Sequence, residues 1–116
     1  MFEVVKIGDK NIPMLAVASA NIYYKRVFGE DPIIMQADRN MTAGENIMFF
    51  MNMGYIMACL AECNGDMAKM QNLNEDTYCE WVSQFNNADY LDAVTEISAV
   101  YNGQNRTTSA EKKDQD

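Results

Sequence analysis

The feature that most constrains this sequence is a long apolar stretch in its middle, from about Ala43 to Cys63. Its large apolar side chains would fall on every side of a helix: Ile47, Met48, Phe50, Met51, Met53, Tyr55, Ile56, Met57 and Leu60. A helix that is apolar all round must be buried. In a chain of only 116 residues, its neighbours have little surface with which to cover it. Part of this helix is therefore a candidate surface for self-association or for a partner.

The same stretch bears on where the protein works. Its most apolar run, Ile47 to Ala61, is shorter than the roughly 20 residues that cross a bilayer, and it contains Asn52 and Gly54. We interpret it as a buried helix and expect no membrane partner. The N-terminus lacks the pattern of a secretory signal, so we expect the protein to stay in the cytoplasm. An odd number of cysteines, three, suits a reducing compartment.

The N-terminal third predicts a hairpin and two short helices. Residues 2–7 (FEVVKI) and 12–17 (IPMLAV) are rich in strand formers and flank the turn sequence GDKN. Pro13 lacks an amide donor, which places its strand at an edge or at its own start. Ser19 is expected to cap a helix that stops at Gly29. Asp31 and the proline after it predict a second helix, to about residue 39.

The C-terminal half predicts two more helices. Asn74 is expected to cap a helix whose apolar residues follow helical spacing: Tyr78, Trp81, Val82 and Phe85. Asn86 and Asn87 should break it. A last helix then follows to near Gly103, with Tyr90, Val94, Ile97 and Tyr101 on one face. The short connection predicts that these two helices pack as an antiparallel pair.

These segments predict a mainly α fold, a small helical domain of four to five helices with a short N-terminal β-hairpin. The domain should span residues 1–103, with the hairpin at about 2–17 and the helices at about 19–102, a length that fits one core. The expected core anchors are Tyr78, Trp81, Phe85, Val94 and Ile97. Residues 104–116 contain no large apolar side chain, which predicts a disordered C-terminal tail.

Charge is distributed unevenly. The formal net charge is -8, and all of the imbalance lies between residues 40 and 103, where Lys69 stands against nine carboxylates. Such a surface repels phosphate backbones, so we expect no nucleic-acid partner. It would attract a basic protein.

Side chains typical of catalysis are scarce. Histidine is absent, which removes the commonest general base and metal ligand. Cys59 and Cys63 could share a helical face as a redox pair, although core filling explains them better. Acidic pairs such as Glu75 with Asp76 more simply complement a helix dipole. We therefore expect no enzyme, no catalytic residue, no cofactor and no metal, and keep a cysteine-dependent redox protein as a weaker alternative.

The ten methionines allow two interpretations. Flexible thioethers fill irregular cores, and they also suit surfaces that accept variable apolar partners. Both interpretations stay open, because different faces of the central helix can serve different purposes. The candidate partner-binding residues are Met48, Met51, Tyr55, Met57 and Glu62.

The order of motifs resembles the tail assembly chaperones of long-tailed phages and prophages of Gram-positive bacteria. Residues 24–31 (YKRVFGED) are similar to that family's segment of aromatic, basic, two variable residues, Phe, Gly, variable and Asp. Residues 73–82 (LNEDTYCEWV) resemble its helix that ends in Trp and Leu, with Val82 in place of the leucine, and residues 106–113 (RTTSAEKK) resemble its common endings. The likeness covers nearly the whole chain, although this central helix carries unusually many methionines.

This resemblance implies a non-enzymatic protein that binds the tape measure protein while the tail is built. Several copies often act together in the family, and the tail tube protein is a further candidate partner. Such a chaperone would act in the cytoplasm of the bacterial host and is not expected in the mature virion. The rival hypothesis is a small structural protein that stays at a tail or head joint. The sequence alone shows neither the oligomeric state nor the binding surface.

Overall fold

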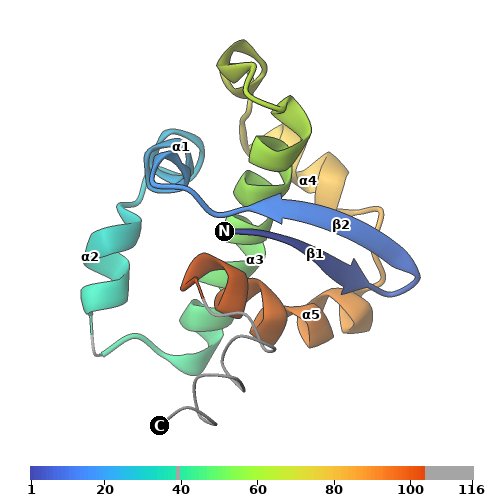
Figure 1. The fold of residues 1–116 in the computed structure, drawn as a ribbon. Helices are drawn as coiled ribbons and strands as arrows, with labels where there is room; N and C mark the ends of the chain where they lie inside the picture. Colours follow the sequence, from blue (N-terminus) through green and yellow to red (C-terminus); the bar gives the residue numbers. More distant parts are fainter. Residues whose placement is uncertain (39, 104–116) are drawn as a thin grey trace, which may run out of the picture.

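The computed structural model describes residues 1–38 and 40–103, so the predicted disordered tail lies outside the described residues. The described part contains five α-helices, one short 3-10 helix and a two-stranded antiparallel hairpin, which confirms the predicted fold class (Figure 1). The elements are β1 (Phe2–Ile7), β2 (Lys10–Leu15), α1 (Ser19–Phe28), α2 (Pro32–Ala37), α3 (Ala43–Cys63), η1 (Met67–Met70), α4 (Glu75–Val82) and α5 (Asn87–Tyr101).

The hairpin turns more tightly than predicted. Ile7 pairs with Lys10, so the turn is only Gly8 and Asp9, and the other half of GDKN belongs to β2. Gly8 has a φ of 63°, at the turn position where a type II′ hairpin needs glycine. Side chains then alternate between the two faces of the sheet. Val5, Ile7 and Met14 are buried, and Phe2 and Val4 are exposed.

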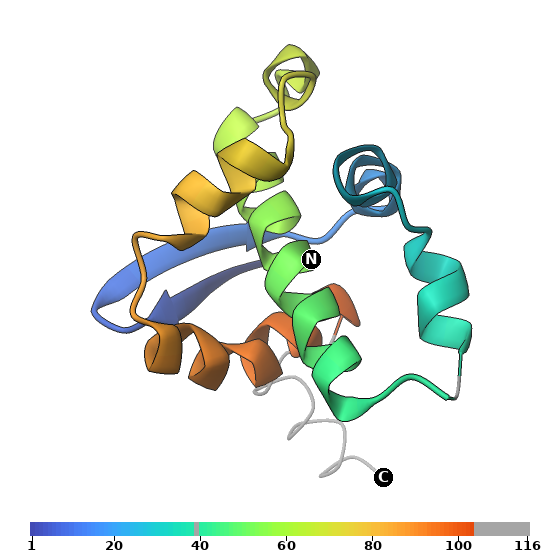
Figure 2. The ribbon, with the colours of Figure 1, turned by 180° about the vertical axis from the view of Figure 1, so that it is seen from behind.

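Helix α3 occupies the centre of the molecule and has the predicted bounds. It begins at a capping box, in which Thr42 and Glu45 each accept a hydrogen bond from the other's backbone N–H at 3.1 Å. It ends where Asn64 adopts a left-handed conformation with a φ of 49°. The hairpin packs on one side of α3, and α1, α4 and α5 pack around it (Figures 1 and 2).

The first two helices differ from the prediction only at their ends. Ser19 is the first helical residue of α1 and not its cap, and the cap position is held by Ala18, which provides no side-chain hydrogen bond. Gly29 ends α1 with a φ of 80°, as predicted. Asp31 caps α2 through its side chain, which accepts a hydrogen bond from the Ile33 N–H at 2.9 Å. The helix is short and stops at Ala37.

Helix α4 is shorter than predicted and leaves Phe85 outside it. The side chains that follow it bond to its last carbonyls. The Ser83 hydroxyl donates to the Cys79 carbonyl at 2.6 Å, and the Gln84 amide donates to the Trp81 carbonyl at 2.9 Å. Its start is as predicted, with Asn74 in a capping box, although Thr77 takes the place usual for Glu or Gln.

The predicted antiparallel pair of α4 and α5 does not form. Helix α5 packs mainly on α3 and β1, whereas α4 lies on α3 (Figure 2). The two helices meet near their connection, where the Phe85 and Tyr90 rings stack with centroids 5.5 Å apart. The α5 face that is fully buried consists of Tyr90, Ala93, Ile97 and Val100. Val94 and Tyr101 flank this face and are partly buried.

Candidate partner-binding surface

The five predicted partner-binding residues do not form one surface. Met48 is half exposed (51%), Met51 is partly buried, and Glu62 is exposed. Tyr55 and Met57 are buried, with exposed fractions of 2% and 0%. Their placement on a contact surface is therefore corrected: both belong to the core of the described chain. Tyr55 is covered because the rings of Tyr78 and Trp81 pack on it, with centroids 5.4 Å away in each case.

The predicted core anchors are buried to different degrees. Ile97 is completely buried. Tyr78, Trp81, Phe85 and Val94 are partly buried and pack against the core. The three aromatic anchors belong to a continuous run of ring contacts: Tyr24, Phe28, Tyr78, Tyr55, Trp81, Phe85 and Tyr90. This run joins α1, α3, α4 and α5, so the α4 aromatic residues hold that helix on the body.

Two tyrosine hydroxyls also fix helices to α3. The Tyr55 hydroxyl donates to Thr77 Oγ1 at 2.7 Å, and the Tyr90 hydroxyl donates to the Met51 carbonyl at 2.6 Å. Burial raises the pKa of Tyr55 to about 12 and also raises the pKa of Tyr90. Gly54 allows the close approach of α5, because a Cβ at this position would lie 2.8 Å from the Tyr90 hydroxyl.

Two of the three cysteines, Cys59 and Cys63, are placed in environments that lower thiol reactivity. Burial raises the pKa of Cys59 to about 11, so this thiol stays protonated at neutral pH, where the thiolate would be the nucleophile. The Cys63 thiol is buried and donates to the Leu60 carbonyl at 3.2 Å. Within residues 1–38 and 40–103, no group of three or more His, Cys, Asp or Glu side chains is placed to hold a metal ion.

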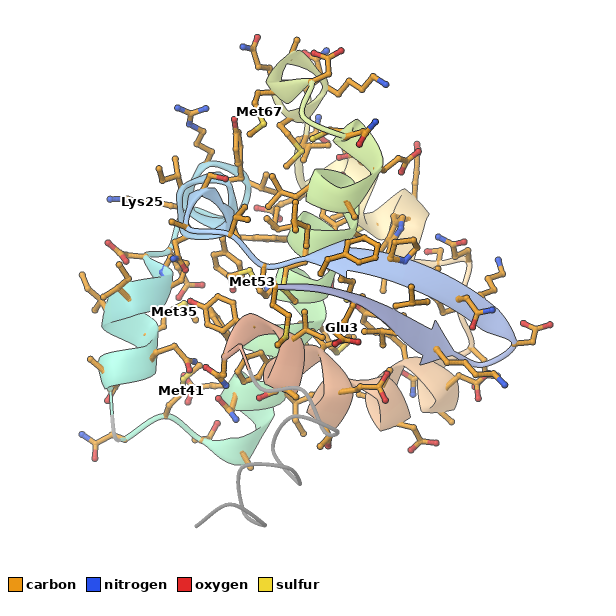
Figure 3. The ribbon with its side chains drawn as sticks, in the orientation of Figure 1. Glu3, Lys25, Met35, Met41, Met53 and Met67 are labelled. Atoms are coloured by element: carbon orange, nitrogen blue, oxygen red, sulfur yellow. The ribbon has the colours of Figure 1, made fainter. Side chains whose placement is uncertain are left out.

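Most of the exposed large apolar side chains lie in three parts of the chain. The first is the outer face of the hairpin, with Phe2 and Val4. The second is the pair of helices α1 and α2, where Ile22, Ile33 and Ile34 are exposed. The third is the start of α3, where Ile47 accompanies Met48. Figure 3 shows the side chains on these elements.

The exposed residues of the hairpin, Phe2 and Val4, and of α2, Ile33 and Ile34, were not predicted as a contact surface. A signal for the hairpin was present, because alternation along β1 places Phe2 and Val4 opposite Val5 and Ile7. For α2, the signal for exposed isoleucines is the shortness of the helix. Successive helical residues point 100° apart, so a six-residue helix that buries Pro32 leaves Ile33 and Ile34 facing away. A large exposed apolar patch on a soluble protein indicates an interaction site.

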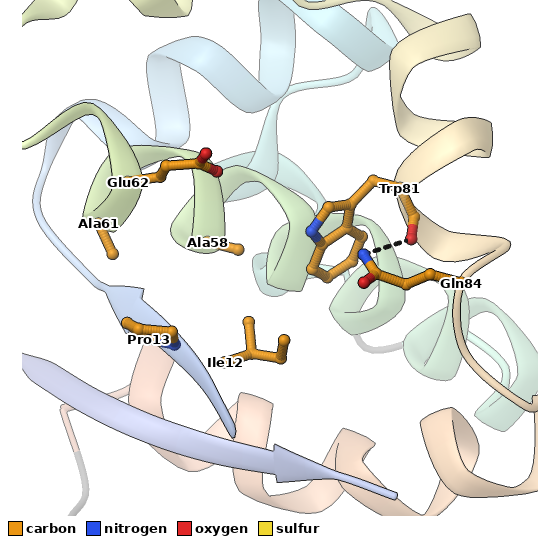
Figure 4. Close-up of a pocket in the computed structure, with 7 residues that line it drawn as sticks. All are labelled: Ile12, Pro13, Ala58, Ala61, Glu62, Trp81 and Gln84. Atoms are coloured by element: carbon orange, nitrogen blue, oxygen red, sulfur yellow. Dashed lines mark hydrogen bonds between the residues drawn. The ribbon is translucent and has the colours of Figure 1, made fainter. Parts of the chain in front are cut away.

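A groove lies between β2, α3 and α4. It encloses about 350 Å³, and Figure 4 shows the side chains that line it: Ile12, Pro13, Ala58, Ala61, Glu62, Trp81 and Gln84. Its floor on α3 is made of small residues, and its only acid is Glu62. We name it the Trp81 groove.

The carboxylates of the body face solvent. Of the nine between residues 40 and 103, Glu96 is partly buried and the other eight are exposed: Glu45, Glu62, Asp66, Glu75, Asp76, Glu80, Asp89 and Asp92. Lys69 is the lone base of this region and is also exposed. The apolar side chains at the start of α3 and the α3 and α4 walls of the Trp81 groove therefore belong to the part of the chain with the excess of negative charge.

Helix α3 extends beyond its most apolar run, Ile47 to Ala61, at both ends. Its 21 residues and its hydropathy are sufficient to cross a membrane by length and composition. Core helices of soluble proteins pass the same test, and 56% of the most apolar window of α3 is buried against the rest of the chain. Its packing between the hairpin and α5 matches a core helix.

Comparisons with protein-family models, with curated proteins and with solved structures found no match for this chain.

Proposed function

We propose that this chain is a phage or prophage tail assembly chaperone that binds the tape measure protein during tail building, without enzymatic activity. The observation that carries the proposal is the exposure of large apolar side chains, among them Met48, Ile33 and Ile34, on a body with a strong excess of exposed carboxylates. The order of sequence motifs, which resembles that family, supports the same function. The high pKa of Cys59 argues against the redox alternative.

Mass action suffices as a mechanism. A tape measure protein is long and prone to coiled-coil association, so its apolar stripes need cover until the tube forms around it. A chaperone that covers such stripes stabilises the soluble client by a free energy that grows with the logarithm of the ratio of free chaperone concentration to the dissociation constant. Tail tube subunits that bind the client more favourably would then displace it.

The acidic surface contributes mainly to the rate of association. Charge attraction accelerates encounter with a basic segment and is screened over about 10 Å at 0.1 M salt. Apolar burial is not screened in this way. We therefore expect the association rate to fall as salt increases, while the dissociation rate changes little.

Co-expression with a tape measure gene from the same genome tests the proposal. The chain should co-purify with a tape measure fragment and should be missing from finished particles. The rate at which the two proteins associate should fall when the salt concentration is raised. The rival structural role, which the exposed apolar side chains would also serve as a permanent interface, predicts a fixed copy number in the mature virion. Detection in virions together with failure to co-purify any tape measure fragment would overturn the chaperone proposal.

A further inference from the structure

We infer that the Trp81 groove binds a lysine or arginine side chain carried by an otherwise apolar segment of a partner protein. The inference deepens the proposed function and rests on it only for the identity of that partner. The groove joins an apolar floor to one aromatic ring and one carboxylate, which is the combination that recognises the aliphatic stem and the charged head of a long basic side chain.

The two recognising groups lie on different helices and line one groove. Glu62 comes from α3 and Trp81 from α4, and Figure 4 draws both among the side chains that line it. Glu62 forms no ion pair with another described residue. Lys69 shares a separate pocket with Glu62 that is also lined by Cys59, Cys63 and Leu73. The carboxylate is thus available to a cation that enters from the Trp81 side.

A related contact involves Gln84, one of the groove residues. Lys10 places its Nζ 5.7 Å from the centre of the Phe85 ring and donates to the Gln84 side-chain oxygen at 3.1 Å. Gln84 also lines the Trp81 groove. In this contact the ammonium group of Lys10 meets a ring and a side-chain amide, and no carboxylate takes part. At Trp81 the ring is accompanied by Glu62, which adds a full negative charge to the same kind of contact.

Main-chain pairing along β2 cannot complete a ladder in this groove. Met1 and Ala16 exchange both backbone hydrogen bonds, at 2.7 and 2.8 Å, so the register alternates and the Val4 and Pro13 pair is a non-hydrogen-bonded one. The backbone of Pro13 therefore points away from β1, and it has no N–H to donate. A segment that docks beside β2 loses a central hydrogen bond. Side-chain recognition at Glu62 and Trp81 must then supply the specificity.

Binding can be measured directly because Trp81 is the sole tryptophan of the chain. The probe is an acetylated and amidated peptide of sequence Leu-Ala-Arg-Ala-Leu, titrated into the full-length protein while Trp81 emission is recorded. A second peptide carries citrulline in place of arginine, which keeps the shape and removes the charge. We expect the arginine peptide to bind about two- to fivefold more tightly than the citrulline peptide, the effect of one partly exposed ion pair.

Two variants locate the effect. Glu62→Gln should abolish the preference for arginine over citrulline. Glu80→Gln, which removes the same charge one residue from Trp81 and outside the groove lining, should retain it. Equal loss in both variants, or equal binding of the two peptides to the parent, would overturn the inference. A dimer in sedimentation that dissociates as peptide binds would assign the groove to a second copy and would also overturn it.

The outcome is independent of the tape measure experiment. Charge-selective peptide binding without tape measure co-purification would overturn the proposed function and leave the groove assignment standing. Tape measure co-purification that Glu62→Gln does not weaken, together with no peptide preference, would overturn the groove assignment alone.

Discussion

The two ends of α3 have similar side chains and opposite environments. Near its start, Ile47 and Met48 are exposed to 39% and 51%. One to three turns later, Met53, Ile56 and Met57 are completely buried. Apolar composition therefore identifies α3 as a helix that is buried somewhere along its length. It does not identify which turns are covered.

The difference arises from what packs beside each end. The later turns lie between the hairpin and α5, and α4 closes a further side through Tyr78 and Trp81 (Figures 1 and 2). The first turns extend past the hairpin, and α2, the element that precedes them in the chain, turns its own isoleucines to solvent. One helix thus provides the core at one end and a candidate contact surface at the other.

The largest effect should come from a charge placed at the buried end. Met57→Lys puts an ammonium group where no water reaches, at a cost of several kcal/mol, and should abolish cooperative unfolding. Met48→Lys makes the same chemical change in the same helix at an exposed position and should alter stability by no more than about 0.5 kcal/mol. Urea unfolding followed by circular dichroism compares the two. Similar stability of both variants would show that the two ends of α3 do not differ.

A smaller effect should come from uncovering the buried end. Trp81→Ala removes the ring that contacts Tyr55, Phe85 and Tyr90. We expect a loss of about 3 kcal/mol, the lower end of the range for truncating a buried large aromatic, because Trp81 is only partly buried. Ile34→Ala on exposed α2 serves as the control and should leave the urea midpoint nearly unchanged. A midpoint for Trp81→Ala that matches this control would indicate that α4 does not hold the core closed.

Local signals predicted most of the fold. The bounds of α3, the glycine stop of α1, the Asp31 cap and the Asn74 cap all follow from short-range backbone hydrogen bonding, which neighbouring residues decide. The errors were also local. Ser19 lies inside α1, with Ala18 at the cap position, and α4 ends at Val82, where the Ser83 and Gln84 side chains bond to its last carbonyls.

The candidate surface was harder to predict because it depends on contacts between distant segments. Tyr55 and Met57 have the composition of a contact surface, yet the hairpin and α4 cover them. The packing of α5 on β1 and α3 instead of α4 depends on Gly54, whose missing side chain admits Tyr90 from far along the chain. The Trp81 groove likewise combines residues of β2, α3 and α4. No spacing within one element shows such a combination.

The smallest effect should appear at high pH. It depends on how far water is excluded from Tyr55 in the covered part of α3. Burial, the largest cause, raises the pKa of Tyr55 from 10.0 to about 12, with smaller contributions from Cys59 and Glu62 and opposition from the Thr77 hydrogen bond. The folded state thus holds the phenol proton more tightly than the unfolded state does. This contribution to stability is fully present below about pH 10 and is lost as pH rises from 10 towards 12.

Tyr55→Phe removes that contribution together with the hydrogen bond to Thr77. We expect the variant to be less stable by about 1 kcal/mol at neutral pH, the usual net value of such a bond. Its loss of stability above pH 10 should also be shallower than in the parent, which keeps the raised pKa of Tyr55 in addition to that of Tyr78. Urea midpoints at about pH 8 and about pH 10.5 measure both effects. An equal alkaline loss in parent and variant would show that water reaches Tyr55 in the folded state, and the contrast between the two ends of α3 would then be one of packing without dehydration.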